Sequence, residues 1–214
     1  MKKILGFISD KINCCIRKYM VMPLKRKSLK HDDMSIISST CNGGVVCHDL
    51  GLRFNSPTVN LWMEPNDFID FAKNLGLYIS STIEDITDET GCGYPVGLLG
   101  GKVKLYFMHY KSFDEALVKW NERKKRINYK HLFFIMTDRD GCTDDMIEKF
   151  DQLPYKNKII FCSRPYDNLS SVIFCKEYEA LECVPILTSW RGISGKRLYD
   201  KYFDFVEWFN NGYV

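Results

Sequence analysis

Several familiar signatures are missing from this chain of 214 residues. It contains neither the Gly-x-Gly-x-x-Gly fingerprint of dinucleotide binding nor the Gly-x-x-x-x-Gly-Lys-Ser/Thr phosphate loop. No cysteines are spaced as Cys-x-x-Cys, and the loose group of Cys41, Cys47 and His48 does not have the spacing of a zinc site. No cleavable signal peptide is evident. These absences exclude the nucleotide-binding and zinc proteins that such motifs define.

Cysteine is plentiful but does not form a disulfide framework. The nine cysteines are odd in number, and Cys162 and Cys175 each end an apolar run. Thiols in that setting are typical of the reduced core cysteines of a cytoplasmic protein. The composition, 45% apolar and 27% charged, is that of a globular chain with a substantial core. We therefore expect a cytoplasmic protein with one large folded domain.

Positive charge is concentrated at the N-terminus, although the net charge is only +3. Residues 1–31 contain nine lysines and arginines against one acidic residue, Asp10. Apolar residues recur there every three or four positions, which predicts a helix with one apolar stripe, formed by Ile4, Leu5, Ile8, Ile12, Cys15, Ile16, Tyr19 and Met20. The stripe is too short and too charged to span a bilayer.

Two interpretations of this basic helix remain open. It could lie on an anionic membrane surface, peripheral to the inner face of the membrane, or it could dock on the protein's own core. Nucleic-acid binding fits poorly, because aromatic and base-reading side chains are not interleaved with the charges. Pro23 and the lysines after it predict a linker. We therefore divide the chain into a basic amphipathic helix with linker, residues 1–33, and a single α/β domain, residues 34–214.

Hydrophobic patterns in residues 34–214 alternate between strands and helices. Short apolar runs predict strands over 34–39, 58–63, 131–137, 158–162 and 171–175. Helical periodicity predicts helices over 43–52, 68–75, 113–126 and 199–209, with another after Thr143. Two β-rich runs, 94–99 and 102–110, flank Gly100-Gly101, which predicts a hairpin. This order is typical of a Rossmann-like three-layer α/β fold, a mostly parallel sheet flanked by helices, with an inserted antiparallel hairpin.

Ligands of such folds bind beyond the carboxyl ends of the strands, so the residues that follow each strand are the candidates for a site. Thr40, Cys41, Asn42, Gly43 and Gly44 follow the first strand. Glycines permit a tight turn and the next helix N-terminus favours an anion, so this turn predicts a phosphate or carboxylate ligand. An ordinary strand-to-helix turn is the alternative.

Charged residues follow two of the other strands. Asp138 and Asp140 come after the strand 131–137 and predict a site for Mg²⁺ or Mn²⁺ beneath a diphosphate. Their alternative is an Asp-Gly turn with a hydrogen-bonded acid. Arg164, after the strand 158–162, and Arg191, in a second basic loop, are expected to bind phosphate. For Arg164 the alternative is a structural ion pair with Asp138 or Asp140, and for both arginines it is a solvated surface.

Cys41 and His109 are the candidates for nucleophile and general base. A thiol at a helix N-terminus has its pKa lowered, and imidazole is the usual proton acceptor. His48 lies seven residues after Cys41, about two helical turns away, and is expected to point elsewhere. His109, near the end of the hairpin, is therefore the better imidazole, with a hydrogen-bonded structural histidine as the alternative.

Several segments after Met34 resemble a bacterial family of unassigned function, loosely labelled exopolysaccharide or capsular polysaccharide biosynthesis proteins. The resemblance rests on Ile36-Ile37-Ser38 before Cys41 and Gly43-Gly44, on His48-Asp49-Leu50-Gly51-Leu52, on Asn55-Ser56-Pro57-Thr58-Val59-Asn60-Leu61, on Tyr94-Pro95-Val96-Gly97, on His109-Tyr110, and on Trp120 with Arg123. This chain has Ser39 and Thr40 where the family often has asparagines. The resemblance implies surface-glycan assembly as the context and transfers no catalytic residue.

Together these features favour a surface-polysaccharide biosynthesis enzyme, a transferase that joins a nucleotide-sugar or other phosphorylated donor to a glycan acceptor. In this hypothesis the first turn receives phosphate, the two aspartates hold the metal, Arg164 neutralises charge and His109 is the base. Two alternatives remain. One is an acyltransferase that uses coenzyme A and Cys41, and the other is a non-enzymatic scaffold that recruits polysaccharide enzymes to the membrane.

Overall fold

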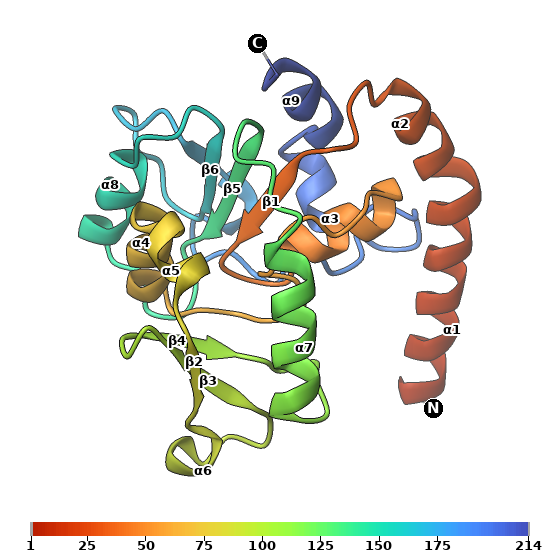
Figure 1. The fold of residues 1–214 in the computed structure, drawn as a ribbon. Helices are drawn as coiled ribbons and strands as arrows, with labels where there is room; N and C mark the ends of the chain where they lie inside the picture. The colour runs from red at the N-terminus through yellow and green to blue at the C-terminus, as the bar shows by residue number, and fades with distance from the viewer. Residues whose placement is uncertain (1, 214) are drawn as a thin grey trace.

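The computed structural model describes residues 2–213, and the side chains of residues 6–213, and has a parallel sheet at its centre (Figure 1). Its strands are β1 (Ser35–Ser38), β5 (Leu132–Thr137), β6 (Lys158–Cys162) and β7 (Val172–Phe174), in the order β1-β5-β6-β7. Every neighbouring pair is parallel. The predicted α/β fold with a mostly parallel sheet is confirmed.

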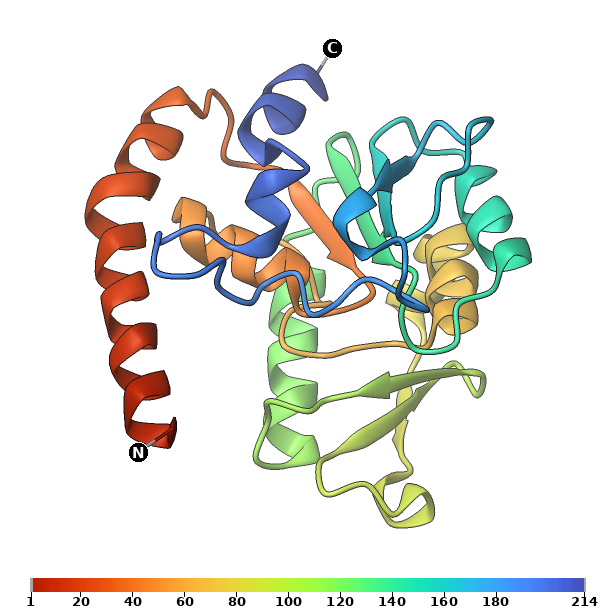
Figure 2. The same ribbon diagram turned by 180° about the vertical axis from the view of Figure 1, so that it is seen from behind.

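Alternate side chains of these strands belong to two hydrophobic cores, so the sheet is covered on both faces. Ile36 and Ile135 pack with helices on one face, α3 (Asn42–Leu50) and α9 (Phe205–Asn211). Ile37 and Phe134 pack with helices on the other, α4 (Pro65–Lys73), α7 (Phe113–Lys124) and α8 (Asp144–Asp151). Figures 1 and 2 show the resulting three layers from opposite sides.

A separate antiparallel sheet contains the predicted hairpin. Its strands β2 (Ile83–Asp85), β3 (Val96–Leu99) and β4 (Val103–Tyr106) lie in chain order, with the short helix α6 (Thr87–Thr90) between the first two. Gly100 and Gly101 have φ of 59° and 70°, the left-handed conformation that a two-residue hairpin turn requires. The hairpin is confirmed, and the strand β2 was not predicted.

Three predicted elements differ from the structure. The run 58–63 contributes only an isolated bridge between Trp62 and Tyr106, because its first residues belong to a turn in which Asn60 adopts a φ of 66°. The stripe expected to stop near Gly76 continues as α5 (Leu75–Ser80). The helix predicted over 199–209 is split into the 3₁₀ helix η3 (Leu198–Lys201) and α9. The split occurs because the Asp204 carboxylate accepts hydrogen bonds from the N–H groups of Val206 and Glu207 and so starts a new helix. A further 3₁₀ turn, η2, covers Lys176–Tyr178.

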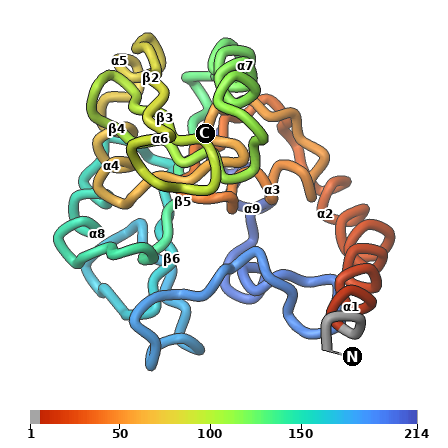
Figure 3. The backbone as a smooth tube through the Cα atoms, turned by 90° about the horizontal axis from the view of Figure 1, so that it is seen from below, coloured from red at the N-terminus to blue at the C-terminus, as the bar shows by residue number. Residues whose placement is uncertain are grey.

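One long helical segment replaces the predicted N-terminal linker. Helix α1 (Lys2–Ile16) continues through the π-helical segment η1 (Arg17–Val21) into α2 (Met22–Ser28). Pro23 lies in the first turn of α2, where its missing N–H group is not needed, so the helix does not end there. Figures 1 and 3 show α1 running along one edge of the molecule. None of the helices in residues 2–213 has both the length and the apolar character required to span a bilayer.

Polar groups hold this helical segment to the rest of the protein. Arg17 is only 3% exposed, and its guanidinium donates to Asp49 Oδ2 at 2.6 Å, to Asp200 Oδ2 at 2.7 Å and to the Tyr199 hydroxyl. Arg197 donates to the same Asp49 oxygen at 2.8 Å. The buried Asn13 amide bonds to the backbone of the loop 192–195. The helical segment therefore docks through these polar groups and through Met22, which is buried in the core, and of the described residues of the apolar stripe Ile16 is half-buried against the loop.

Asp49 should make the stability of this docking depend on pH. Burial alone would raise the pKa of the Asp49 carboxyl, but the guanidiniums of Arg197 and Arg17 outweigh burial and lower it. Because the folded pKa lies below the unfolded one, the stabilisation is complete above about pH 5 and is lost as the pH falls through the folded pKa. We expect Asp49→Asn to lower the free energy of urea unfolding at neutral pH, with a difference from wild type that shrinks towards about pH 3. The exposed Asp10→Asn is the control, and a pH-independent difference for Asp49→Asn would contradict this account.

Candidate functional site

A pocket of about 400 Å³ lies beyond the ends of β1 and β5. Five segments line it, with the residues Thr40, Cys41, Asn42, Trp62, Met108, His109, Arg139, Asp140, Ile186, Leu187 and Thr188. The fold therefore brings together several candidates that the sequence predicted separately, namely Thr40, Cys41, Asn42, His109 and Asp140. It leaves Gly43, Gly44, Asp138, Arg164 and Arg191 out of the pocket lining.

The two glycines after Asn42 allow close packing at the start of α3. A Cβ on Gly43 would lie 2.8 Å from Ser38 Cβ and 3.0 Å from Ile36 Cγ2, and a Cβ on Gly44 would lie 3.3 Å from Val59 Cγ1. A side chain on Gly43 would push the helix off β1, and one on Gly44 would press on Val59 in the turn before Trp62. Close packing thus accounts for both glycines, and it places the start of α3 at the pocket wall.

Asp138 supports the pocket from behind. The side chain is 7% exposed, and its Oδ2 accepts the N–H of Ser163 at 2.7 Å and the hydroxyl of Ser163 at 3.0 Å. Its Oδ1 accepts the N–H of Val184 at 2.8 Å, just before the pocket residues 186–188. Both oxygens are therefore committed to holding β6 and the loop after it in place.

These bonds do not fit the predicted pairing of Asp138 with Asp140 as metal ligands. Asp140 lines the pocket from a turn in which Asp140 and Gly141 have φ of 59° and 80°. Across residues 2–213, no three or more His, Cys, Asp or Glu side chains are grouped to hold a metal ion. Binding of Mg²⁺ or Mn²⁺ stays a prediction that rests on Asp140 alone.

Arg139, not Arg164 or Arg191, places a guanidinium at the pocket. Its Nη1 donates to the backbone oxygen of Val184 at 3.1 Å, which fixes the side chain along the wall. Arg164 is instead half exposed and forms an ion pair at 2.9 Å, but its partner is Asp144 and not Asp138 or Asp140, the partners that its alternative interpretation named. Arg191 is exposed, in the loop that docks on Asn13. Arg139 lies between Asp138 and Asp140, which the sequence singled out as metal ligands, and no local signal assigned a role to Arg139 itself.

Cys41 lies at the start of α3 in a largely buried position. Burial raises the pKa of its thiol, which is the opposite of the expected helix N-terminus effect. Cys41 and His109 line the same pocket, yet no hydrogen bond between these two described residues is present. His109 itself is exposed and reaches the pocket from the chain just beyond β4.

Comparison with known proteins places the chain in a family. A family model described as a domain of unknown function, DUF1919, matches residues 12–210. The chain belongs to this family. It is also 40% identical over 204 residues to an uncharacterized protein of Haemophilus influenzae, covering 95% of this chain and 97% of that protein. The resemblance to a bacterial family of unassigned function is confirmed at this level, and neither description names a polysaccharide.

One wall of the pocket is formed by Trp62, a residue that the sequence analysis did not identify as a candidate. Trp62 stacks on Tyr106 with ring centroids 4.0 Å apart and an angle of 9° between the rings, and the Tyr106 hydroxyl donates to Glu64. Close by in sequence, the Tyr110 hydroxyl donates to the backbone oxygen of Val59 and accepts from Arg123. These bonds hold the segment with Met108 and His109 against the segment before Trp62. The isolated bridge to β4 decides this position, and no local sequence pattern marks it.

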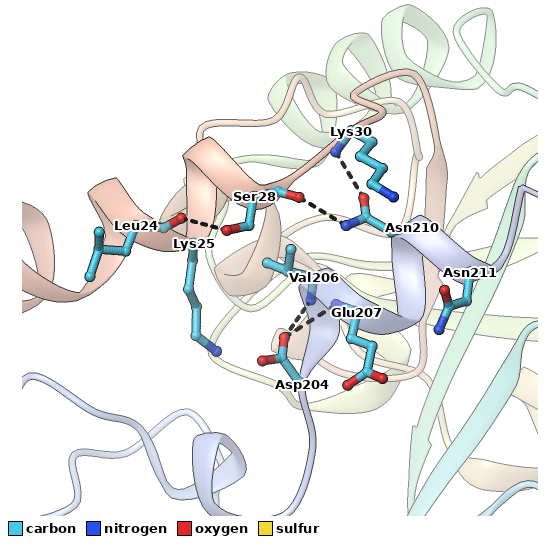
Figure 4. Close-up of a pocket in the computed structure, with 9 residues that line it drawn as sticks. All are labelled: Leu24, Lys25, Ser28, Lys30, Asp204, Val206, Glu207, Asn210 and Asn211. Carbon is cyan, nitrogen blue, oxygen red and sulfur yellow. Dashed lines mark hydrogen bonds between the residues drawn. The ribbon is translucent and has the colours of Figure 1, made fainter.

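The protein has a second pocket, whose polar residues are explained by structural hydrogen bonds. It measures about 420 Å³ and lies between α2 and α9 (Figure 4). The Asn210 side chain accepts from the Lys30 N–H and donates to the Ser28 oxygen, while Asp204 caps α9. Lys25 pairs with Asp200. The polar groups of this second pocket tie the N-terminal segment to the last helix.

Proposed function

We propose that the pocket is the active site of a surface-polysaccharide biosynthesis enzyme, a transferase that uses a nucleotide-sugar or another phosphorylated donor. The observation that carries this proposal is the meeting of the α3 N-terminus, the Arg139 guanidinium and the His109 imidazole in one pocket of about 400 Å³. That volume lies within the range of small-molecule sites. The polysaccharide context comes from the sequence resemblance.

The two kinds of wall suit the two parts of a nucleotide-sugar. The first N–H groups of a helix lack partners within the helix and carry partial positive charge, so the start of α3 and Arg139 favour a diphosphate between them. The other part of the lining is apolar. Trp62, Met108 and Ile186 present surfaces that suit a flat base or the carbon face of a sugar.

His109 is the group that could move a proton in this site. As general base it would take the proton of an acceptor hydroxyl, while the acceptor oxygen bonds to the sugar carbon. The bond from that carbon to the phosphate oxygen breaks, and the diphosphate leaves with the electron pair. Arg139 lies where it can offset the developing charge. Asp140 would be the pocket ligand of Mg²⁺ or Mn²⁺, which would further neutralise the diphosphate when bound.

The proposal also includes the acceptor substrate and the location of the enzyme in the cell. A glycan acceptor on a lipid carrier would place the enzyme in the cytoplasm, peripheral to the inner face of the membrane. The acyltransferase alternative is disfavoured, because burial raises the pKa of Cys41 and leaves little thiolate for attack on an acyl group. A non-enzymatic scaffold is an outcome of the test below.

Binding and turnover can be separated by two matched pairs of variants. We expect nucleotide-sugars to raise the melting temperature of the protein, and Arg139→Gln to weaken their binding in calorimetry about tenfold, as expected for a lost charged hydrogen bond. The control is Arg164→Gln, outside the pocket. His109→Gln should leave donor binding unchanged and abolish donor consumption, with the exposed His48→Gln as its control.

Other outcomes would redirect the proposal. Stabilisation by coenzyme A that is lost in Cys41→Ser would favour acyl transfer. No stabilisation by any phosphorylated donor, with and without Mn²⁺, would contradict the transferase and leave the scaffold.

A further inference from the structure

Most of the apolar stripe predicted for the N-terminal helix faces outward, although Ile16 is half-buried against the loop at Gly195. Ile8 is 49% exposed, Ile12 41% and Tyr19 67%, and Met20 and Leu24 continue the exposed apolar surface into α2. The side chains of Ile4 and Leu5, also predicted in the stripe, lie outside the described residues. Exposed apolar side chains scattered singly are ordinary, but these are spaced by helical turns on one element.

The opposite side of the same helix is the one that docks. Asn13 and Arg17 are four residues apart and are both buried. A Cβ on Gly195 would lie 2.7 Å from the backbone nitrogen of Arg17, so the loop and the helix are in close contact there. Ile8, Ile12, Cys15 and Tyr19 follow steps of four, three and four residues and form a separate face. The domain therefore fixes which way the apolar stripe points.

Basic side chains border this outward face. Lys11, Lys18 and Lys27 are exposed, and none of the three forms an ion pair with an acidic side chain in the described part of the chain. Lys11 and Lys18 lie instead over the rings of Phe7 and Tyr19. Arg17 and Lys25, by contrast, are used by the docking contacts. An apolar stripe beside unpaired lysines is the surface that an anionic bilayer complements.

We propose that α1 binds flat on an anionic lipid surface, with Ile8, Ile12 and Tyr19 in the interface and the lysines against the headgroups. The buried Arg17 and Asn13 then set the orientation of the whole domain on the membrane. A second copy of the chain is a poorer occupant, because two such helices face to face would bring their lysines together. This inference is independent of the pocket chemistry, so failure of either leaves the other standing.

Vesicle sedimentation of the full chain tests the proposal. We expect binding to phosphatidylcholine vesicles that contain about 30% phosphatidylglycerol, weak binding to pure phosphatidylcholine, and loss of the difference at high salt. The double variant Ile8→Gln, Ile12→Gln should bind the anionic vesicles about tenfold or more weakly. Lys11→Gln, Lys18→Gln should lose most of the preference for anionic lipid.

Matched controls separate this surface from general stickiness. Leu77→Gln with Val118→Gln removes two side chains of similar exposure, 64% and 55%, from α5 and α7, and should bind like wild type. Circular dichroism and the melting temperature check that every variant is folded. The proposal is overturned by absent binding to anionic vesicles or by equal binding of the Ile8, Ile12 variant. It is also overturned by light scattering that shows a wild-type dimer and a monomeric variant.

Discussion

Replacement of Arg17 by methionine should lower the free energy of unfolding by about 3–5 kcal/mol, the cost of removing one partner from a buried ionic network. The guanidinium reaches two carboxylates, Asp49 and Asp200, and both have side chains that are 5–6% exposed. Methionine fills a similar volume but leaves these charges with fewer partners. Urea denaturation at neutral pH, followed by circular dichroism, measures the loss.

Lys18→Met is the control for Arg17→Met, because Lys18 is the next residue and is exposed. It should change the free energy of unfolding by about 0.5 kcal/mol or less. A near-neutral Arg17→Met would show that the N-terminal segment is not fixed by this network. The orientation inferred for the membrane-facing stripe would then lose its structural basis.

Asp138→Asn should cost about 2–3 kcal/mol of unfolding free energy, because an amide cannot accept all three of the hydrogen bonds that Asp138 receives. Its NH₂ group would face either the Ser163 N–H or the Val184 N–H. Ser163 and Val184 are both fully buried, so water does not replace the lost bond. The melting temperature and urea midpoint of the metal-free protein provide the measurement.

Asp140→Asn is the matched control, since it is the same substitution two residues away. Asparagine tolerates the left-handed conformation of this turn, so stability should stay within about 0.5 kcal/mol of wild type. A pair of metal-binding carboxylates predicts a different pattern, in which either substitution relieves charge repulsion and stabilises the metal-free protein. Observation of that pattern would restore the paired metal site.

The elements that sequence predicted correctly are those whose signal is local. The apolar run of β5 and the helical periodicity of α7 each depend on residues within a few positions. Gly100-Gly101 likewise encodes its own hairpin turn. The predicted boundaries are wrong at Asp204, whose side chain caps and starts the last helix, and at Pro23, which lies in the first turn of α2 and does not end the helical segment.

The candidate site was partly predictable for the same reason. Parallel strands carry their following residues to one edge, which brought Cys41 and Asp140 to one pocket. No local pattern distinguishes Arg139, which lines that pocket, from Arg164, which pairs with Asp144. The local sequence also does not show that Asp138 accepts a hydrogen bond from a loop 46 residues away.

The sequence by itself determined the α/β class, the hairpin, the concentration of lysine and arginine at the N-terminus and the periodic apolar stripe, because composition and spacing are properties of neighbouring residues. Only the tertiary structure decided which charged residues meet, and which face of the N-terminal helix is buried. Arg17 lies 32 residues from Asp49 and 183 from Asp200, and such pairings are selected by packing of the whole chain. The helix consequently buries Asn13 and Arg17 and exposes most of its apolar stripe, a choice that amphipathic patterning alone left open.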